Sequence, residues 1–456
     1  MRGRALGVLS ASALAVGGMV ALAGPASAVT LNCGDTVTSS VTLSNDLGPC
    51  TGNGLVIGAS GITLNLGGHT ITGSNTTNTT SNEQVGILIQ GMRNVIVQNG
   101  TVTGFDAGVA ITKGSKNQVI NVTAHDNINH SSLVNAPGAA TNHCNFGDGI
   151  VVTGSNNNII KNNTAFHNGP FDGIAMVGNS DNNIVSGNKV YDQTVSNELP
   201  PAGSGNNGPC GPFSATPTGA GRLHQDIGIR VEGPGANNNT VVANIVSDNQ
   251  LNGISIHGYV CLNGGGANPP PNFPPRGEPN TGNLIQTNTV RGNGFPDGLD
   301  GIGILSQGPL GTVTCGSNNN TIIGNTSIGN AGSGIYVTRT GDNAITSSNT
   351  VSQNIVKNNV RDGIQLQGPN MVCPLLAPRD PNTRACLAPL EARNGSNNNT
   401  LISNKGTGNA VDDGFDGNPQ CDQNFWQQNI FGTVNQACVA AHNGTGTVTG
   451  PIPVFP

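Results

Sequence analysis

The most regular feature of the sequence is a short group of alternating apolar residues that recurs along most of the chain. Each group is Gly, an apolar residue, any residue and a second apolar residue, and the groups begin at Gly61, Gly86, Gly108, Gly149, Gly173, Gly228, Gly253, Gly301, Gly334 and Gly363. The closest groups are 25, 22, 24 and 25 residues apart. This spacing is typical of one coil of a β-solenoid, whereas helical repeats are usually longer.

The two apolar positions of a group lie two residues apart, so on a strand they point to the same face. The pairs are Ile87/Ile89, Val109/Ile111, Ile150/Val152, Ile174/Met176, Ile229/Val231, Ile254/Ile256, Ile302/Ile304, Ile335/Val337 and Ile364/Leu366. β-Branched side chains predominate, as suits a parallel sheet buried on one face. We therefore expect an all-β parallel β-helix of about ten to eleven rungs with capped ends.

A second pattern, Asn followed five residues later by Asn, comes after most of these groups. It occurs at Asn163/Asn168, Asn244/Asn249, Asn288/Asn293, Asn325/Asn330 and Asn404/Asn409. Asn tolerates left-handed backbone geometry at turns, and identical amides on successive strands can bond in a ladder. These residues are expected at the corners of the rungs.

The two ends of the chain differ from the repeats. Residues 1–28 carry Arg2 and Arg4, an apolar run and Ala26-Ser27-Ala28, the pattern of a cleaved signal peptide. A secreted, extracellular protein without a membrane span is expected. Residues 29–60 and 412–456 are assigned as N-terminal and C-terminal caps of a β-helix at 61–411, because an open solenoid end needs a cover.

Five longer gaps between groups mark insertions. They span residues 129–146, 195–225, 259–282, 307–316 and 369–395. Insertions on one face of a solenoid commonly form its binding surface. We expect these to overhang one face of the β-helix.

All ten cysteines follow the signal segment, and none has the C-x-x-C spacing of zinc or redox sites. An even number of cysteines in an exported chain favours structural disulfides. The expected pairs are Cys33 with Cys50, Cys421 with Cys438, and Cys373 with Cys386. The connectivity of the other four stays open: Cys144, Cys210, Cys261 and Cys315.

The segment Gly68-His69-Thr70-Ile71-Thr72-Gly73 and the Asn-rich rungs resemble the right-handed β-helix repeat families of the pectate-lyase-like superfamily. The resemblance covers nearly all of the chain after the signal segment and implies a right-handed parallel β-helix. That superfamily contains polysaccharide lyases, hydrolases and epimerases, and also tailspikes and adhesins, so the fold alone does not define the activity.

Candidate catalytic residues lie at the outward positions of the later groups. The side chains there are polar or charged, whereas those of the earlier groups are mostly small or apolar. Arg230, Glu232, His257 and Tyr336 stand there. Residues at the same position of neighbouring rungs should lie roughly 4.8 Å apart, so Arg230 and Tyr336 are expected in one column, with Glu232 and His257 in a second column beside it. Asp226, Asp300 and Asp362 precede the same strands. Carboxylates at set separations can bind Ca²⁺ or supply the acid and base of glycoside cleavage. These seven residues are the candidate catalytic set.

Plainer interpretations exist for the same residues. Asp-Gly is an ordinary turn dipeptide, and polar side chains on a solenoid often only face water. The segment Asp412 to Gly417 has acids in a calcium-loop pattern, but Gly414 and Gln423 stand where ligands are required.

Two classes of function therefore remain. The first is a secreted polysaccharide lyase or glycoside hydrolase that acts on an extended glycan, with Ca²⁺ as its candidate cofactor. The presence of only one Trp and three Tyr counts against it, because sugars stack well on rings. The second is a non-catalytic extracellular binding or structural β-helix. Nucleic acid is not expected as a partner, because the formal charge is -6 and no basic face is apparent.

Overall fold

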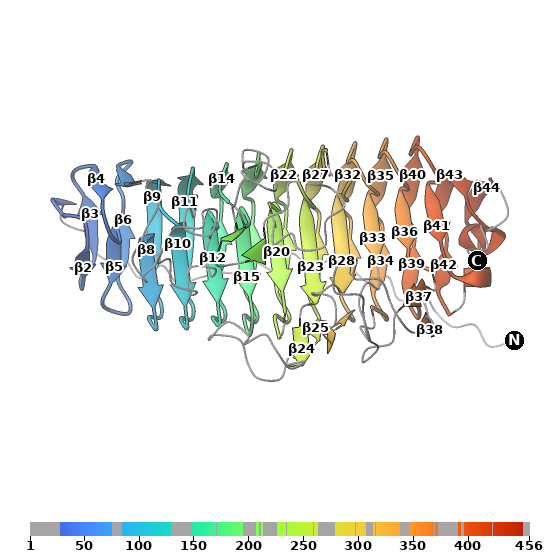
Figure 1. Cartoon of the computed structure of the whole chain (residues 1–456), viewed down its shortest axis with the longest axis horizontal. Helices are drawn as coiled ribbons and strands as arrows, with labels where there is room; N and C mark the ends of the chain where they lie inside the picture. Colours follow the sequence, from blue (N-terminus) through green and yellow to red (C-terminus); the bar gives the residue numbers. More distant parts are fainter. Residues whose placement is uncertain are drawn as a thin grey trace, which may run out of the picture.

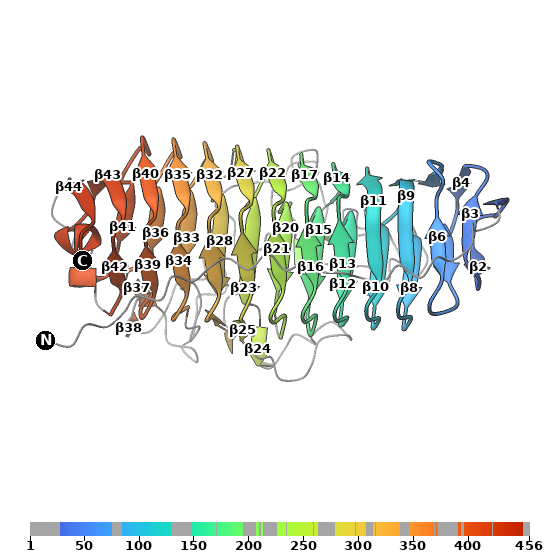
Figure 2. The same ribbon diagram turned by 180° about the vertical axis from the view of Figure 1, so that it is seen from behind.

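The computed structural model confirms a parallel β-helix, with rungs stacked in chain order along one long axis (Figure 1). The same stack is seen from behind in Figure 2, with the first and last rungs at opposite ends. The structure describes residues 28–74, 84–128, 147–169, 171–194, 207–208, 211–212, 226–233, 235–258, 260–262, 279–296, 298–306, 313–314, 316–337, 346–368, 370–372, 391–393, 396–421 and 423–449.

Each rung gives one strand to each of three parallel sheets, which we call sheets 1, 2 and 3. Sheet 1 contains β2 (Asp35–Val37), β5 (Leu55–Ile57), β8 (Val85–Gln90), β10 (Ala107–Thr112), β12 (Ile150–Thr153), β15 (Ile174–Val177), β20 (Ile229–Glu232), β23 (Ile254–Gly258), β28 (Ile302–Ser306), β33 (Ile335–Val337), β36 (Ile364–Leu366) and β41 (Gly414–Asp416).

Sheet 2 contains β1 (Ala28–Val29), β3 (Val41–Leu43), β6 (Thr63–Asn65), the first parts of β9 (Ile96–Thr103) and β11 (Gln118–His125), β13 (Ile159–Lys161), β16 (Ile184–Ser186), β21 (Thr240–Val242), β26 (Leu284–Gln286), β31 (Thr321–Ile323), β34 (Thr350–Ser352), β39 (Thr400–Ile402) and β42 (Phe425–Gln427). These strands follow the sheet 1 strands across the first corner of each rung.

Sheet 3 contains β4 (Leu47–Cys50), β7 (Thr70–Gly73), the second parts of β9 and β11, β14 (Thr164–Phe166), β17 (Lys189–Tyr191), β22 (Ile245–Ser247), β27 (Thr289–Arg291), β32 (Thr326–Ile328), β35 (Ile355–Lys357), β40 (Lys405–Thr407), β43 (Ile430–Val434) and β44 (Thr445–Val448). Its strands from β9 to β43 lie along the upper edge in both Figures 1 and 2.

Short elements lie outside the three sheets. They are β18 (Asn207–Gly208) with β19 (Gly211–Pro212), β24 (Val260–Leu262) with β29 (Val313–Thr314), β25 (Asn280–Thr281) with β30 (Ser317–Asn318), β37 (Asn370–Val372) with β38 (Glu391–Arg393), and the 3₁₀ turns η2 (Pro419–Cys421) and η3 (Ala437–Ala440). In the described part of the chain, no helix is long and apolar enough to span a membrane.

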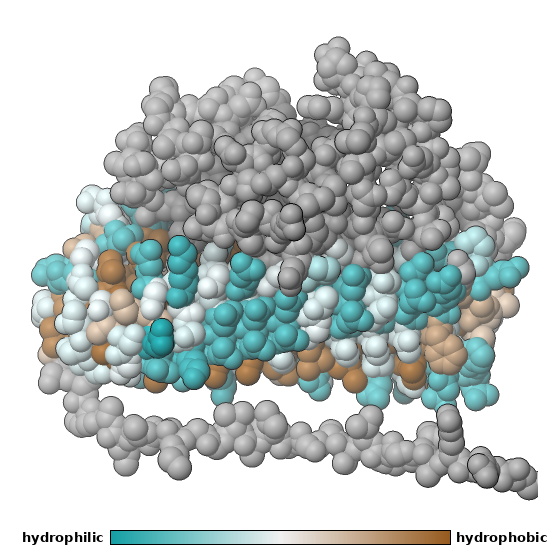
Figure 3. Space-filling view, turned by 90° about the horizontal axis from the view of Figure 1, so that it is seen from below, coloured by the Kyte–Doolittle hydropathy of each residue, from teal (hydrophilic) through white to brown (hydrophobic). Residues whose placement is uncertain are grey.

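The apolar pairs of the repeat point inward, as expected. All of them, from Ile87 and Ile89 to Ile364 and Leu366, have no exposed surface and belong to one continuous core. On the outside, Figure 3 shows one face on which hydrophilic residues gather in the middle, with a row of apolar residues below them and further apolar residues towards both ends.

The glycine that begins each repeat from Gly86 onward is required by a close approach. Gly61 was wrongly grouped with them: it precedes β6 of sheet 2, and an added Cβ there would meet nothing within 4 Å. At Gly228, an added Cβ would lie 2.4 Å from Val246 Cγ1, 2.6 Å from the carbonyl oxygen of Gly253 on the next rung, and 2.8 Å from Asn249 Nδ2. Side chains do not fit where the corner of sheet 3 meets the start of sheet 1, so only Gly suits this position.

The asparagines form buried ladders at the corners, as the sequence predicts. In the ladder between sheets 2 and 3, the backbone N–H and Nδ2 of Asn288 both donate to Asn325 Oδ1, and those of Asn325 both donate to Asn354 Oδ1, at 2.9 to 3.0 Å. The left-handed residue is the one before the ladder position, such as Thr287 with φ 51° or Gln353 with φ 57°. The ladder therefore satisfies backbone donors that the turns leave unpaired.

Both terminal disulfides are confirmed. Cys33 pairs with Cys50, and Cys421 pairs with Cys438, each across 17 residues. Cys373 and Cys386 lie outside the described residues. The sheets extend into residues 29–60 and 412–456 through β2 to β5 and β41 to β44, and the role of these segments as caps stays a prediction.

The insertions all adjoin sheet 1. Residues 129–146 and 195–225 connect sheet 3 to sheet 1, and residues 259–282, 307–316 and 369–395 connect sheet 1 to sheet 2. Most of their residues lie outside the described part of the chain. By chain position, they flank sheet 1 on both edges and leave the other corner of the rung, between sheets 2 and 3, without an insertion.

Candidate functional site

The outward positions of sheet 1 form the two columns that the sequence predicts. Backbone pairing aligns Ala175, Arg230, Ser255, Gly303, Tyr336 and Gln365 in the first column. The second column aligns Val177, Glu232, His257 and Leu305. Arg230 on β20 is therefore flanked by Ser255 on β23, one rung away.

The columns are less exposed than the plainer interpretation, a face of polar side chains in water, requires. Arg230 is 1% exposed and Glu232 is 5% exposed, and Ser255 is also buried. His257 is half-buried, as are Val177 and Leu305 in the same column. The second column is thus the more accessible of the two.

Arg230 is the centre of a charged cluster, which we call the Arg230 cluster: Asp172, Arg230, Glu232 and His257. Its Nη2 lies 2.8 Å from Glu232 Oε1 and 2.9 Å from His257 Nδ1, and its Nη1 lies 3.8 Å from Asp172 Oδ2. A guanidinium can only donate, so His257 Nδ1 accepts and the neutral ring carries its proton on Nε2. Three adjacent rungs contribute to this cluster.

The carboxyl groups of the cluster hold protons more tightly than usual. Burial raises the pKa of Asp172 to about 7, against the opposing charge of Arg230. Burial also raises the pKa of Glu232, again opposed by Arg230. Asp148, at the same corner one rung earlier, has a raised pKa because of burial and the neighbouring charge of Asp172. Asp172, whose pKa lies near neutral, is therefore suited to acid or base catalysis.

Several buried polar atoms of the cluster and of the adjacent Ser255 have no hydrogen-bond partner among the residues that the structure describes. They are Nε and Nη1 of Arg230, Oδ1 of Asp172 and Oγ of Ser255. A buried donor or acceptor without a partner costs about 1 to 3 kcal/mol. The unused donors and acceptors are therefore available to a bound ligand.

The corner aspartates further along the helix have a structural role. Asp300 Oδ1 accepts the backbone N–H of Ser333 at 2.7 Å, and Asp362 Oδ1 accepts that of Asp412 at 3.1 Å. Each carboxyl thus bonds the backbone of the next rung. Among the described residues, no group of three or more His, Cys, Asp or Glu is arranged to hold a metal ion, which gives the expectation of Ca²⁺ no support there.

The other predicted residues are spread along sheet 1. Asp226 is buried at the corner before β20, close in sequence to the cluster. Tyr336 lies two rungs beyond Ser255, which corresponds to roughly 10 Å, and it is half-buried. The structure brings Arg230, Glu232 and His257 together and leaves Tyr336, Asp300 and Asp362 apart from them. Asp172 is the member of the cluster that the candidate set missed; its place at the corner one rung before Arg230 was the available signal.

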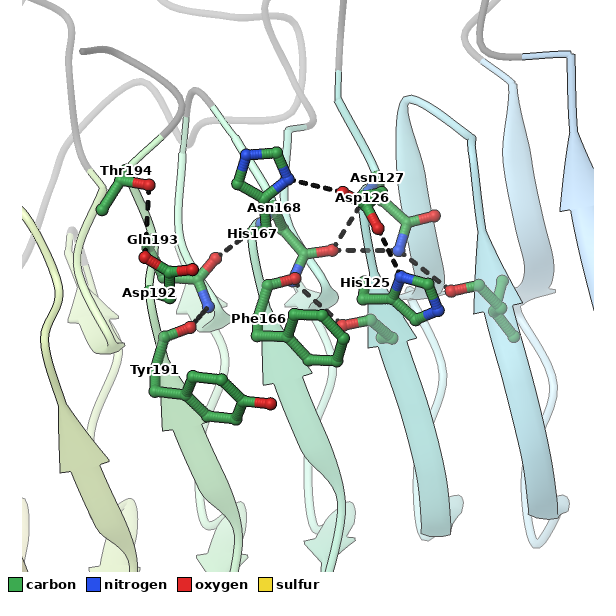
Figure 4. Close-up of polar contacts among 12 residues, drawn as sticks. His125, Asp126, Asn127, Phe166, His167, Asn168, Tyr191, Asp192, Gln193 and Thr194 are labelled. Carbon is green, nitrogen blue, oxygen red and sulfur yellow. Dashed lines mark hydrogen bonds and ion pairs between the residues drawn. The ribbon is translucent and has the colours of Figure 1, made fainter. Parts of the chain in front are cut away.

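A second group, on sheet 3, was missed entirely. Asp126 bridges two imidazoles, with Oδ2 at 2.5 Å from His125 Nδ1 and Oδ1 at 2.5 Å from His167 Nδ1 (Figure 4). Burial alone would raise the pKa of Asp126, but the hydrogen bonds and charges of His125 and His167 outweigh it and hold the pKa below its usual value. No repeat pattern predicts this group, because the equivalent positions of other rungs hold different residues.

Three rings of this group are stacked on one another. His125 and Phe166 have centroids 4.7 Å apart, Phe166 and Tyr191 have centroids 5.1 Å apart, and Lys189 Nζ lies 4.4 Å from the Tyr191 centroid. The ring faces therefore cover each other and do not offer a flat surface to a sugar. We interpret this group as a clamp between rungs.

Comparison with known families agrees with the fold. The model of the right-handed β-helix region matches residues 29–263, more than half of the chain. The chain belongs to the right-handed β-helix family. A search of curated proteins gave no match.

Solved structures similar to this right-handed β-helix protein are distant. A periplasmic alginate epimerase is 14% identical, with 83% of this chain and 69% of the other covered and a TM-score of 0.43. The A-module of a mannuronan C-5 epimerase from Azotobacter vinelandii is 15% identical, with 85% and 88% covered and a TM-score of 0.43. A pectate lyase is 12% identical, with 87% and 74% covered and a TM-score of 0.39.

Proposed function

We propose that this protein is an enzyme that cleaves an extended polysaccharide on the outer side of sheet 1, with the Arg230 cluster as its catalytic centre. The observation that carries the proposal is a buried arginine on the outward side of the sheet, held between Glu232 and His257, with unused donors. Buried charges cost stability and are often kept for function. Insertions on both edges of sheet 1 place this cluster where a solenoid commonly binds ligands.

The geometry favours a lyase acting on sugar acids over a hydrolase. The unused Nε and Nη1 of Arg230 suit a carboxylate, which would be neutralised next to the sugar carbon that loses its proton. A base of the cluster takes that proton, the bond from the neighbouring carbon to the leaving sugar oxygen breaks, a double bond forms, and an acid returns a proton to the oxygen. Asp172 and Glu232, both with raised pKa values, suit these two roles.

The test is cleavage of acidic and neutral polysaccharides, followed both by absorbance from unsaturated ends and by release of reducing ends. We expect Glu232→Gln and Arg230→Lys to reduce turnover at least a hundredfold, because general acid–base catalysis contributes about 10² to 10⁴ in rate. Lys161→Gln, on the exposed face of sheet 2, is the control and should keep full turnover. Thermal unfolding of each variant separates loss of activity from loss of fold.

Each outcome has a distinct meaning. Reducing ends without absorbance would assign hydrolysis, with Asp172 and Glu232 as the acid and base. Full turnover in folded Glu232→Gln would remove the Arg230 cluster from the mechanism. No turnover on any polymer would instead favour the second class of function, a non-catalytic extracellular binding protein.

A further inference from the structure

The outward face of sheet 3 carries a row of cations, in contrast to the acidic chain as a whole. Four exposed cations stand on its strands: Lys189 on β17, Arg291 on β27, Lys357 on β35 and Lys405 on β40. We call these four residues the basic strip. The formal charge of the whole chain is -6, so this face differs in sign from the average.

Backbone pairing sets the spacing of the basic strip. Arg291 and Lys357 occupy the same column, with Ile328 of β32 between them. Lys189 lies two rungs before Arg291, and Lys405 lies one rung after Lys357. Cations two rungs apart are separated by roughly 10 Å, so the strip is a sparse line of charge parallel to the long axis of the molecule.

No acid neutralises the C-terminal part of the strip. The outward positions of β22, β27, β32, β35 and β40 include no Asp or Glu. Exposed acids at the neighbouring corner end with Asp192 and Asp248, and the next rungs have Gly292, Gly329, Asn358 and Gly408 there. None of the four cations forms an ion pair with another residue that the structure describes. Lys189 lies over the Tyr191 ring, and the charges of Arg291, Lys357 and Lys405 are therefore the ones available to a partner.

We propose that the basic strip binds an anionic polysaccharide lying along the outside of sheet 3, at a surface separate from the Arg230 cluster. Charge complementarity requires an extended polyanion, and the residues between the cations suit sugars: Thr289 and Thr326 offer hydroxyls, and Ile328 offers an aliphatic surface. Acidic glycans carry one carboxylate on a bulky sugar unit, which suits widely spaced cations.

Nucleic acid fits the strip less well. Along a DNA duplex, each strand carries one phosphate about every 3.4 Å, a denser line of charge than one cation per roughly 10 Å. Single strands are usually held by aromatic side chains on which bases stack. The outward positions of the sheet 3 strands β22, β27, β32, β35 and β40 have no aromatic residue, and Tyr191 on β17 is already covered by Phe166 and Lys189. The cations of the basic strip would leave most phosphates of a nucleic acid unpaired.

The test is electrophoresis of the purified protein in native gels that contain polygalacturonate, with dextran as the neutral comparison. Polygalacturonate should retard the triple variant about tenfold less than the unmodified chain; the variant carries Arg291→Gln, Lys357→Gln and Lys405→Gln. Each exposed ion pair contributes modestly to binding, and this variant removes three of them. The matched control is Lys113→Gln, Lys116→Gln, Lys161→Gln, which removes the same charge from exposed positions outside sheet 3. Its retardation should stay near that of the unmodified chain. NaCl at 0.5 M should abolish the retardation of all three proteins.

The possible failures are distinguishable. An equal loss of retardation in both triple variants would show a general charge effect and overturn the proposal. Unchanged retardation of the sheet 3 variant would overturn it as well. Stronger retention by a single-stranded oligonucleotide than by polygalacturonate would also overturn it. Turnover of short soluble glycans tests the Arg230 cluster separately, and the sheet 3 variant should keep it.

Discussion

At the scale of single residues, burial is the main influence on the carboxyl groups of sheet 1. Asp300 and Asp362 are buried at rung corners, and burial raises the pKa of each to about 7. Each still accepts a backbone N–H of the next rung, which a carboxyl does whether or not it is protonated. The folded chain therefore holds protons that the unfolded chain releases.

This predicts that the protein is more stable in mild acid than at neutral pH. The folded pKa near 7 lies above the unfolded value of 3.8, so the unfolding free energy falls as the pH rises from about 4 to about 7. Asp300→Asn keeps the acceptor oxygen and removes the titration, so its stability should depend less on pH. Chemical denaturation at pH 5 and pH 8 checks both statements.

The control for this experiment is Asp181→Asn. Asp181 also accepts a backbone N–H of the next rung, from Asn237 at 2.9 Å, but at a half-exposed corner. Its pH dependence should match that of the unmodified chain. A protein more stable at pH 8 than at pH 5 would contradict the prediction, because it would mean that Asp300 is ionised in the folded state without cost.

At the scale of elements, the amide ladders fix the corners as firmly as the apolar pairs fix the strands. Asn325 both accepts from Asn288 and donates to Asn354, and its Nδ2 also donates to the carbonyl of Ile285 at 2.9 Å. The side chain of each ladder residue thus bonds main-chain groups of the preceding rung and the ladder side chain of the next rung. Removing one amide leaves donors and acceptors unpaired in the interior.

Asn325→Ala should therefore lower the unfolding free energy by about 2 to 4 kcal/mol. The reason is that it leaves more than one buried group unpaired, and each such group costs about 1 to 3 kcal/mol. Asn397→Ala, at a half-exposed position of the Asn-rich turn before β39, is the control and should cost less than about 0.5 kcal/mol. Urea unfolding measures both. Similar costs for the two variants would show that the ladder adds little.

The sequence predicted the elements better than the site. Alternation and repeated Asn depend on local geometry that recurs in every rung, so Ile229, Val231 and the ladder residues could be assigned from spacing. The pairing of Arg230 with Asp172 depends on which rungs become neighbours across the insertion at 195–225, and no repeat encodes that. The burial of Arg230 was missed for a similar reason, since alternation gives the direction of a side chain but not what lies over it.

At the scale of the whole molecule, the β-helix is a one-dimensional stack whose ends differ from its middle. Inner rungs pair with two neighbours, whereas end rungs pair with one, so opening begins at the ends. Disulfides close loops at both ends, Cys33 with Cys50 and Cys421 with Cys438. The C-terminal end also contains Trp426, which is buried and donates to Asp416 Oδ2 at 2.9 Å.

Trp426 is the one tryptophan of the chain, so its fluorescence reports on the C-terminal end alone. Replacing Cys421 and Cys438 together by Ser should destabilise that end by about 3 kcal/mol, the value for a loop of this length. The Trp426 fluorescence transition should then occur at a lower denaturant concentration than the loss of β-sheet circular dichroism. Replacing Cys33 and Cys50 should leave the Trp426 transition close to that of the unmodified chain, because the affected rung lies at the far end of the stack. Coincident transitions in both double variants would instead mean that the rungs unfold as one cooperative unit and that the disulfides stabilise the whole molecule.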